Sequence, residues 1–321
     1  QDHRLQRAAL ICQPRVRPST RQDLLRRLRR PAVETGDSFR LASAFQANIS
    51  ESHYNRTFEK VQAYIHAGDC YQVNLAQRFS APCAGLPWPA YLALRSLACA
   101  PFSAYLALDD DGAIMSLSPE RFVSLHGKHV ETSPIKGTRP RHRDRRADEM
   151  AAEDLRSSEK DRAENLMIVD LLRNDLGRNC EPGSIHVDRL FEVQSFPTVH
   201  HLVSTVSGEL REGRGAFELL RDSFPGGSIT GAPKRRAMEI IAELEPHRRQ
   251  VYCGAILYIS ADGRMDSNIA IRTLLCHEGE IHCWGGGGIV ADSQWQREYQ
   301  ETWDKVGLFL NCLESMNKRS S

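Results

Sequence analysis

The feature that most restricts how this chain can fold is a run of short apolar segments joined by tight turns. Four of these segments form two predicted hairpins: Ser103–Leu108 with Ala113–Leu117, and Arg121–His126 with His129–Ser133. The connecting residues, Asp109–Gly112 and Gly127–Lys128, have the composition of turns. Further strands are predicted over residues 185–208 and 251–290. Because strands joined by tight turns pair antiparallel, the sequence predicts antiparallel sheets.

Helical patterns alternate with these runs of strands. In the first of them, Tyr54, Phe58, Val61 and Ile65 recur at the spacing of one helix face, and Gly68 follows where a helix would end. Further helices are predicted over residues 146–173, 215–222, 233–245 and 294–314. Helices that are segregated from antiparallel strands pack outside the sheets, so we expect a protein of the α+β class.

Charge and cysteine content restrict the class of protein. The chain has 42 basic and 41 acidic residues, so no global field favours a nucleic acid or an anionic membrane as partner. No uncharged apolar run approaches the roughly 18 residues that would span a membrane. The cysteines are scattered and include no Cys-x-x-Cys pair, which is typical of reduced thiols. We therefore expect a cytoplasmic protein that binds neither nucleic acid nor membrane.

Residues 1–45 differ in composition from the rest of the chain. Nine of the first 30 residues are arginine, which would also suit an arm that binds nucleic acid. However, no aromatic residues are interleaved with these charges, and Leu24, Leu25 and Leu28 form an apolar stripe. A short helix with arginines on its solvent-exposed face is the favoured interpretation. Because the chain begins with Gln1 rather than methionine, we expect this segment to be the remnant of a longer N-terminal region.

Two pairs of acidic residues lie on predicted helices that are far apart in the sequence. Asp161 and Glu164 are three residues apart, and so are Glu298 and Glu301. Residues at i and i+3 share a helix face, so each helix can direct two carboxylates toward one point. Carboxylate oxygens of this kind suit Mg²⁺. The alternative, which the spacing alone favours, is that both pairs lie on solvated faces, with Glu301 pairing to Lys305.

The segments on either side of the second hairpin carry a carboxyl group and an amine. They are SPERF, which contains Glu120, and SPIKGTRPR, which contains Lys136. A strict two-residue turn would direct the two side chains to opposite faces, whereas a bulge or a longer loop would place both on one face. A lysine beside a carboxyl group can be a nucleophile with its general acid, or only half of an ion pair. Nucleophilic work requires the pKa of the lysine to fall well below its usual value of about 10.4.

Two segments are rich in glycine: PGGSITGAPK (225–234) and WGGGGIVAD (284–292). The first is similar to a phosphate-binding loop but lacks the Gly-Lys-Ser/Thr ending, because Pro233 precedes Lys234. We interpret both segments as donors of backbone N–H groups to a carboxylate rather than to a nucleotide.

A fourth segment, Cys276–Cys283, has cysteine and histidine at a spacing that zinc could use. The same residues also fit a hairpin that turns at Glu278–Gly279, with the cysteines merely alternating along its strands. Because no Cys-x-x-Cys or paired histidine motif accompanies it, the hairpin is the favoured interpretation.

Taken together, these motifs resemble those of the chorismate-utilising enzymes, the family of anthranilate synthase component I and its relatives. The resemblance covers about residues 50–313. Besides the segments above it includes five motifs: GDCYQVNLAQRF (68–79), DRAENLMIVDLLRNDLGR (161–178), HHLVSTV (200–206), IRTL (271–274) and EYQETWDK (298–305). The resemblance implies large antiparallel β-sheets packed as a sandwich with helices outside. It also implies a chorismate-binding catalytic domain over residues 46–316.

The resemblance implies a role for each candidate site residue. Four residues would bind Mg²⁺, the first two directly and the others through water: Glu164, Glu301, Asp161 and Glu298. The metal would hold the ring carboxylate of chorismate. Four others would hold the enolpyruvyl carboxylate, the glycines through their backbone: Arg272, Tyr252, Gly286 and Gly288. His201 and Ser228 would line the pocket for the ring.

Lys136 distinguishes the branches of this family. The resemblance places it where the branch that aminates carbon 4 of chorismate has lysine, and where anthranilate and isochorismate synthases usually have alanine. Gln72 favours the same branch, because isochorismate synthases resemble this stretch but have a water-activating lysine there. The implied mechanism begins when Lys136 attacks carbon 2 while protonated Glu120 releases the carbon-4 hydroxyl as water. Ammonia then adds at carbon 4 and expels the lysine.

The ammonia would come from a glutamine amidotransferase subunit, because no cysteine of this chain lies in a Gly-x-Cys-x-Gly segment. The chain is thus expected to be the aminating subunit of an enzyme of folate synthesis. One alternative is an anthranilate synthase subunit, which aminates carbon 2 and expels pyruvate. The alternative from another class is an inactive fragment or a non-catalytic partner subunit.

Overall fold

A computed structural model describes residues 15–29, 38–109, 112–197 and 199–317 of the chain. These residues fall into two compact units, one of which holds α1 (Pro18–Arg29) and the other the residues from Ser38 onward. The helix predicted around Leu24–Leu28 is therefore confirmed, although none of its side chains is buried. The rest of the predicted N-terminal remnant lies largely outside the described residues, and its boundary at residue 45 remains a prediction.

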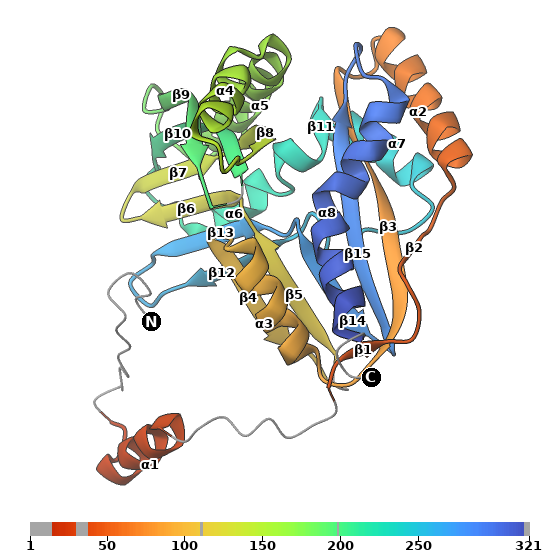
Figure 1. Ribbon diagram of the computed structural model, residues 1–321. Coiled ribbons are helices and arrows are strands. Elements are labelled where there is room, and N and C mark those ends of the chain that lie inside the picture. Colours follow the sequence, from red (N-terminus) through yellow and green to blue (C-terminus); the bar gives the residue numbers. More distant parts are fainter. Residues whose placement is uncertain (1–14, 30–37, 110–111, 198, 318–321) are drawn as a thin grey trace. The chain divides into compact units, whose positions relative to one another are not determined.

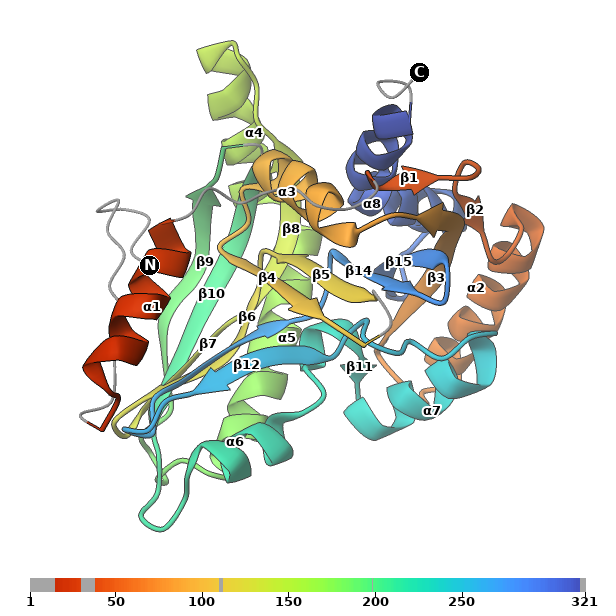
Figure 2. The same cartoon turned by 90° about the horizontal axis from the view of Figure 1, so that it is seen from below.

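The second unit is built on two antiparallel sheets, which are visible in Figures 1 and 2. The first sheet has the order β1-β3-β15-β14-β5-β4, with β2 and β11 also paired to β3. Its strands are β1 (Arg40–Leu41), β2 (Gln46–Ala47), β3 (Gln72–Ala84), β4 (Phe102–Ala107), β5 (Ala113–Ser118), β11 (Gly231–Ala232), β14 (Thr273–His277) and β15 (Glu280–Ile289). The β14–β15 hairpin turns at Glu278–Gly279, as predicted.

The second sheet has the order β12-β13-β6-β7-β10-β8, with β9 also paired to β10. Its strands are β6 (Arg121–His126), β7 (His129–Ser133), β8 (Ile135–Pro140), β9 (His186–Ser195), β10 (Val199–Glu209), β12 (Ala255–Ile259) and β13 (Met265–Ile269). Apolar side chains of both sheets meet in one core, where Phe122 and Val206 of the second sheet join Leu275 and Trp284 of the first. The predicted sandwich of antiparallel sheets is thereby confirmed.

Helices cover the outer faces of the sheets, as predicted. They are α2 (Glu51–His66), α3 (Pro87–Ala98), α4 (Arg145–Ser157), α5 (Glu159–Gly177), α6 (Ala216–Ser223), α7 (Lys234–Leu244) and α8 (Trp295–Asn317), with the short 3₁₀ helix η1 (Gly227–Ile229). Figure 1 shows α8 along β15, and α5 packs against β10 and β8. No helix among the described residues is both long and apolar enough to cross a membrane.

The single helix predicted over residues 146–173 is in fact two helices. Ser158 between them has an extended backbone, and its hydroxyl accepts a hydrogen bond from the backbone N–H of Asp161. A serine in this position caps the start of a new helix, which is why α4 ends and α5 begins there.

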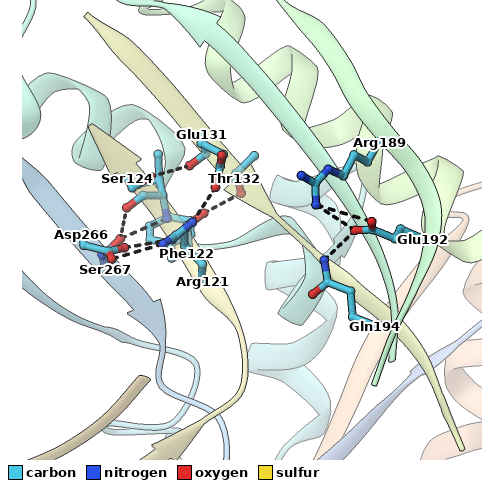
Figure 3. Close-up of polar contacts among 11 residues, drawn as sticks. Arg121, Phe122, Ser124, Glu131, Thr132, Arg189, Glu192, Gln194, Asp266 and Ser267 are labelled. Carbon is cyan, nitrogen blue, oxygen red and sulfur yellow. Dashed lines mark hydrogen bonds and ion pairs between the residues drawn. The ribbon is translucent and has the colours of Figure 1, made fainter. Parts of the chain in front are cut away.

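The chain crosses from the first sheet to the second between β5 and β6, and Arg121 fixes this corner. Its guanidinium group donates hydrogen bonds to Asp266 of β13 and Glu131 of β7 (Figure 3), and it lies 5.4 Å from the ring centroid of Phe102 in β4. Because this network holds Arg121 between the two sheets, it also fixes the backbone of Glu120, the residue before it.

α8 lies so close to β15 that there is no room for a side chain at Gly285. A Cβ atom at this position would lie 2.2 Å from the backbone oxygen of Thr302. Real Cβ atoms do not approach a backbone atom so closely, so the glycine determines how near the helix can come to the strand.

We expect the substitution Gly285→Ala to lower the free energy of unfolding by about 1–3 kcal/mol, because helix and strand must separate. Gly307→Ala on the same helix is the control, since a Cβ there meets nothing within 4 Å. It should raise stability by about 0.5–1 kcal/mol through helix propensity. Urea unfolding followed by circular dichroism measures both changes. Equal stability of Gly285→Ala and the wild type would contradict the close packing.

Candidate active site

The β6–β7 hairpin brings Glu120 and Lys136 to one place. Its turn is the predicted two-residue turn, with His126 opposite His129, but the register shifts by one residue between Arg121 and Ser124. This irregularity corresponds to the bulge, which was one of the two arrangements that would place both side chains on one face.

Both side chains meet at Ser228 in η1. The hydroxyl of Ser228 donates a hydrogen bond to Oε1 of Glu120 over 2.8 Å, and Nζ of Lys136 donates to the backbone oxygen of Ser228 over 3.3 Å. The carboxyl group of Glu120 is buried, with 4% of the residue exposed. A half-buried amine and a buried carboxyl group therefore contact the same serine.

Burial moves the pKa values of these two groups in opposite directions. Burial raises the pKa of Glu120, and the hydrogen bond from Ser228 and the charge of Lys136 offset this only in part. Burial lowers the pKa of Lys136, against the attraction of Glu164 and Glu120. Because each shift favours the uncharged form, the pair tends toward a neutral amine beside a protonated acid.

His201 and Arg272 form a second part of the site. Nδ1 of His201 lies 2.9 Å from the hydroxyl oxygen of Thr138 in β8. Burial, and then the positive charge of Arg272, lowers the pKa of His201 to about 4, so its ring is neutral at physiological pH.

Arg272 is a half-buried cation beside His201. Burial lowers its pKa, and no group among the described residues accepts a hydrogen bond from its guanidinium group. A buried charge that is not paired is costly, so this arginine is suited to bind an anionic ligand.

The glycines of β15 allow polar side chains to approach the strand. A Cβ atom at Gly286 would lie 2.9 Å from Oη of Tyr252, and one at Gly288 would lie 2.2 Å from Nε2 of Gln72. Gln72 is fully buried, and neither polar atom of its amide has a hydrogen-bond partner among the residues described. Such an amide is suited to a polar ligand, because leaving it unsatisfied costs free energy.

Only some of the four acidic residues on α5 and α8 lie close together. Burial raises the pKa of Glu164, and the charges of Lys136 and Lys160 offset this in part. The negative charges of Glu298 and Glu301 raise it further. The structure therefore brings together three of the four acidic residues that the sequence singled out. The fourth, Asp161, accepts a hydrogen bond from Nη2 of Arg139 over 3.1 Å.

Two lysines that the site prediction did not include contact these carboxylates. Nζ of Lys160 lies 3.8 Å from Glu164 and 3.6 Å from Glu298, and Lys305 pairs with Glu301 over 2.5 Å. The Lys305 contact is the i, i+4 pair weighed from the sequence. Lys160 precedes Glu164 at the same spacing, so the signal for its pairing was present as well.

The chemistry of this donor set fits a hard divalent cation. Glu164, Glu298 and Glu301 supply carboxylate oxygens, which are the ligands that Mg²⁺ prefers. In the part of the chain that the structure describes, however, no three acidic, histidine or cysteine side chains form a ready set of metal ligands.

An antiparallel sandwich that encloses a lysine–acid pair, a buried arginine and a carboxylate cluster is the framework of an enzyme for an anionic substrate. A family model described as "chorismate binding enzyme" matches residues 2–311. The chain therefore belongs to the chorismate-binding enzyme family, and the resemblance drawn from its motifs is confirmed.

Individual relatives agree with this assignment. The chain is 56% identical over 281 residues to aminodeoxychorismate synthase component 1 of Salmonella typhimurium, with 88% of this chain and 62% of that protein covered. The protein of the same name from Klebsiella aerogenes is 57% identical over 278 residues, with 87% and 61% covered. The chain thus spans about three fifths of the length of these curated relatives.

A solved structure supports the fold. The crystal structure of anthranilate synthase component I from Streptococcus pneumoniae matches with a TM-score of 0.85 and 36% identity. The match covers 96% of this chain and 71% of the other. The fold expected from the resemblance, that of anthranilate synthase component I, is therefore confirmed.

The raised pKa of Glu120 predicts a pH-dependent effect of Glu120→Gln on stability. Because the pKa is higher in the folded state, the wild type loses stability as the pH rises from the usual range of a glutamate. The loss is about 1.4 kcal/mol for each tenfold decrease in the acid dissociation constant on folding. Glutamine cannot ionise, so the variant should gain stability relative to the wild type as the pH rises above about 4. Urea unfolding at several pH values measures this difference, and a constant difference would rule out the raised pKa.

Proposed function

We propose that this chain aminates carbon 4 of chorismate, as the component I subunit of an aminodeoxychorismate synthase in para-aminobenzoate and folate synthesis. The observation that carries the proposal is the pairing of Lys136 and Glu120 at one serine. The pKa of Glu120 is raised and that of Lys136 is lowered, and each shift favours the neutral form of its group. A neutral amine is a nucleophile, and a protonated carboxyl group is a general acid. The names of the relatives from Salmonella and Klebsiella support the same activity.

The reaction uses both groups in one step. The amine of Lys136 forms a bond to carbon 2 of the ring, the two ring double bonds shift, and the carbon-4 hydroxyl leaves. Glu120 gives its proton to that hydroxyl, which departs as water. Ammonia then adds at carbon 4, the double bonds shift back, and the amine of Lys136 leaves carbon 2. The hydrogen bond from Ser228 holds the acid in position for its proton transfer.

The remaining residues would hold the two carboxylates of the substrate. Arg272, whose guanidinium group has no hydrogen-bond acceptor among the described residues, would bind the enolpyruvyl carboxylate together with Tyr252 and the backbone of Gly286 and Gly288. His201, which is neutral, would line the ring pocket together with Ser228. The family resemblance supports these roles.

The carboxylates of α5 and α8 would hold a magnesium ion. Glu164 and Glu301 would bind it directly and Glu298 and Asp161 through water, and the bound ion would supply positive charge for the ring carboxylate. For Asp161 this role competes with its hydrogen bond from Arg139.

The ammonia would come from a glutamine amidotransferase subunit. The designation "component 1" in the names of the relatives implies a second component. An assay with ammonium salts bypasses this partner, so it tests the chain by itself.

We expect the chain, given chorismate, Mg²⁺ and ammonium, to form a product that retains the enolpyruvyl group. Lys136→Ala should abolish this product, a loss of at least about 10³-fold, while chorismate still binds. Lys128→Ala, an exposed lysine in the β6–β7 turn, is the control and should retain activity. Mass spectrometry identifies the product. Anthranilate and pyruvate instead would assign the chain to the alternative amination at carbon 2, and undiminished turnover by Lys136→Ala would exclude the covalent step.

The substitution Arg272→Gln should show whether this arginine binds the ligand or stabilises the fold. The variant should raise KM for chorismate about 10- to 100-fold, which corresponds to the loss of a charge-assisted hydrogen bond. Its free energy of unfolding should stay equal or rise, because an unpaired buried charge is removed.

Arg249→Gln is the matched control for this prediction. Arg249 is likewise half-buried, but its guanidinium group donates to Glu245 and to the backbone oxygens of Ile229 and Asn74. Its replacement should destabilise the fold strongly. If Arg272→Gln destabilised the protein as much as Arg249→Gln and left KM unchanged, the arginine would have a structural role.

A further inference from the structure

We propose that Lys160 competes internally with the divalent cation for the carboxylates of α5 and α8, and that it must leave them for the cation to bind. The inference rests on the proposed function, because it assumes that these carboxylates hold a cation. Lys160 is not one of the proposed metal ligands, but it would lower the affinity of the site for the cation.

The position of Lys160 carries the proposal. Its ammonium group lies between the two helices, 3.8 Å from Oε1 of Glu164 on its own helix and 3.6 Å from Oε1 of Glu298 on α8. Both carboxylates are largely buried, with 15% and 3% of their side chains exposed. Lys160 therefore supplies positive charge to the same oxygens that a cation would use.

Lys160 is also free to move away. Its side chain is 55% exposed, and both of its contacts are longer than a direct hydrogen bond. The contacts are thus electrostatic attractions without a fixed geometry, and the long side chain can turn into solvent. A lysine of this kind can be displaced at little structural cost.

Lys305, the other lysine at the carboxylates, is held differently. Its ammonium group lies 2.5 Å from Glu301 and donates a hydrogen bond over 2.7 Å to the backbone oxygen of Gly286. Two short contacts on α8 and β15 fix it in place. Of the two lysines, Lys160 is therefore the one that a cation would displace.

This arrangement has consequences for both the free and the cation-bound protein. Without a cation, Lys160 reduces the repulsion among Glu164, Glu298 and Glu301 and so holds α5 and α8 together. Cation binding must first break these contacts, so the affinity is lower than the carboxylates alone would give. Removing the positive charge should therefore destabilise the free protein and strengthen cation binding.

The test is Lys160→Met, which keeps the length of the side chain but removes its charge. Isothermal titration with MgCl₂ should give a Kd about three- to tenfold lower than that of the wild type. The Tm without Mg²⁺ should fall, and the rise in Tm on adding Mg²⁺ should be larger than in the wild type. Lys60→Met, an exposed lysine on α2, is the control and should change neither quantity.

An unchanged or higher Kd for Mg²⁺ in Lys160→Met would overturn the proposal, because the lysine would then be neutral or helpful to binding. Should this variant fail to fold, acetylation of the wild type by acetic anhydride provides an independent measurement. Mg²⁺ should increase the labelling of Lys160 by releasing its amine, with Lys60 as the internal reference, and no increase would overturn the proposal. Both readouts measure cation binding, so they are separate from the identity of the product.

Discussion

The burial of a lysine and a glutamate on either side of Ser228 is the interaction on which the site depends. In water each group would be charged, and burial shifts each group toward its uncharged form by raising the pKa of Glu120 and lowering that of Lys136. In the mechanism that we propose, the same burial prepares a nucleophile and an acid at once. Ser228 keeps the two groups apart by contacting each through a different oxygen, so that neither simply neutralises the other as a direct ion pair.

The sandwich makes this arrangement possible because the groups of the site come from elements far apart in the sequence. The bulge in β6 directs Glu120 and Lys136 to one place, η1 supplies Ser228, and α5 and α8 bring carboxylates from two outer helices. Glycines along β15 let α8 and Tyr252 approach the strand closely. The carboxylate of Glu164 on α5 and the amine of Lys136 each affect the pKa of the other. The cation site and the lysine–acid pair therefore influence each other electrostatically.

Much of this architecture could be predicted from the sequence, because period-two and period-3.6 patterns are local. The β6–β7 strands and their turn were predicted at their observed positions. The pattern missed β3, whose buried residues do not alternate with polar ones, and α3, which begins with Pro87 in an apolar stretch. The bulge was only one of the alternatives, since register depends on tertiary packing. The contacts of Asp161 with Arg139 and of Lys160 with α8 are also tertiary, so residue spacing alone did not predict them.

The measurement that tests this account most directly is the ionisation of Lys136 itself. The rate at which its amine is acetylated, followed by peptide mass spectrometry across a pH series, gives its pKa in the folded protein. The account predicts a value clearly below the usual 10.4 or so of lysine. A pKa at or above that usual value would show an ordinary ammonium group and would contradict the proposed nucleophile.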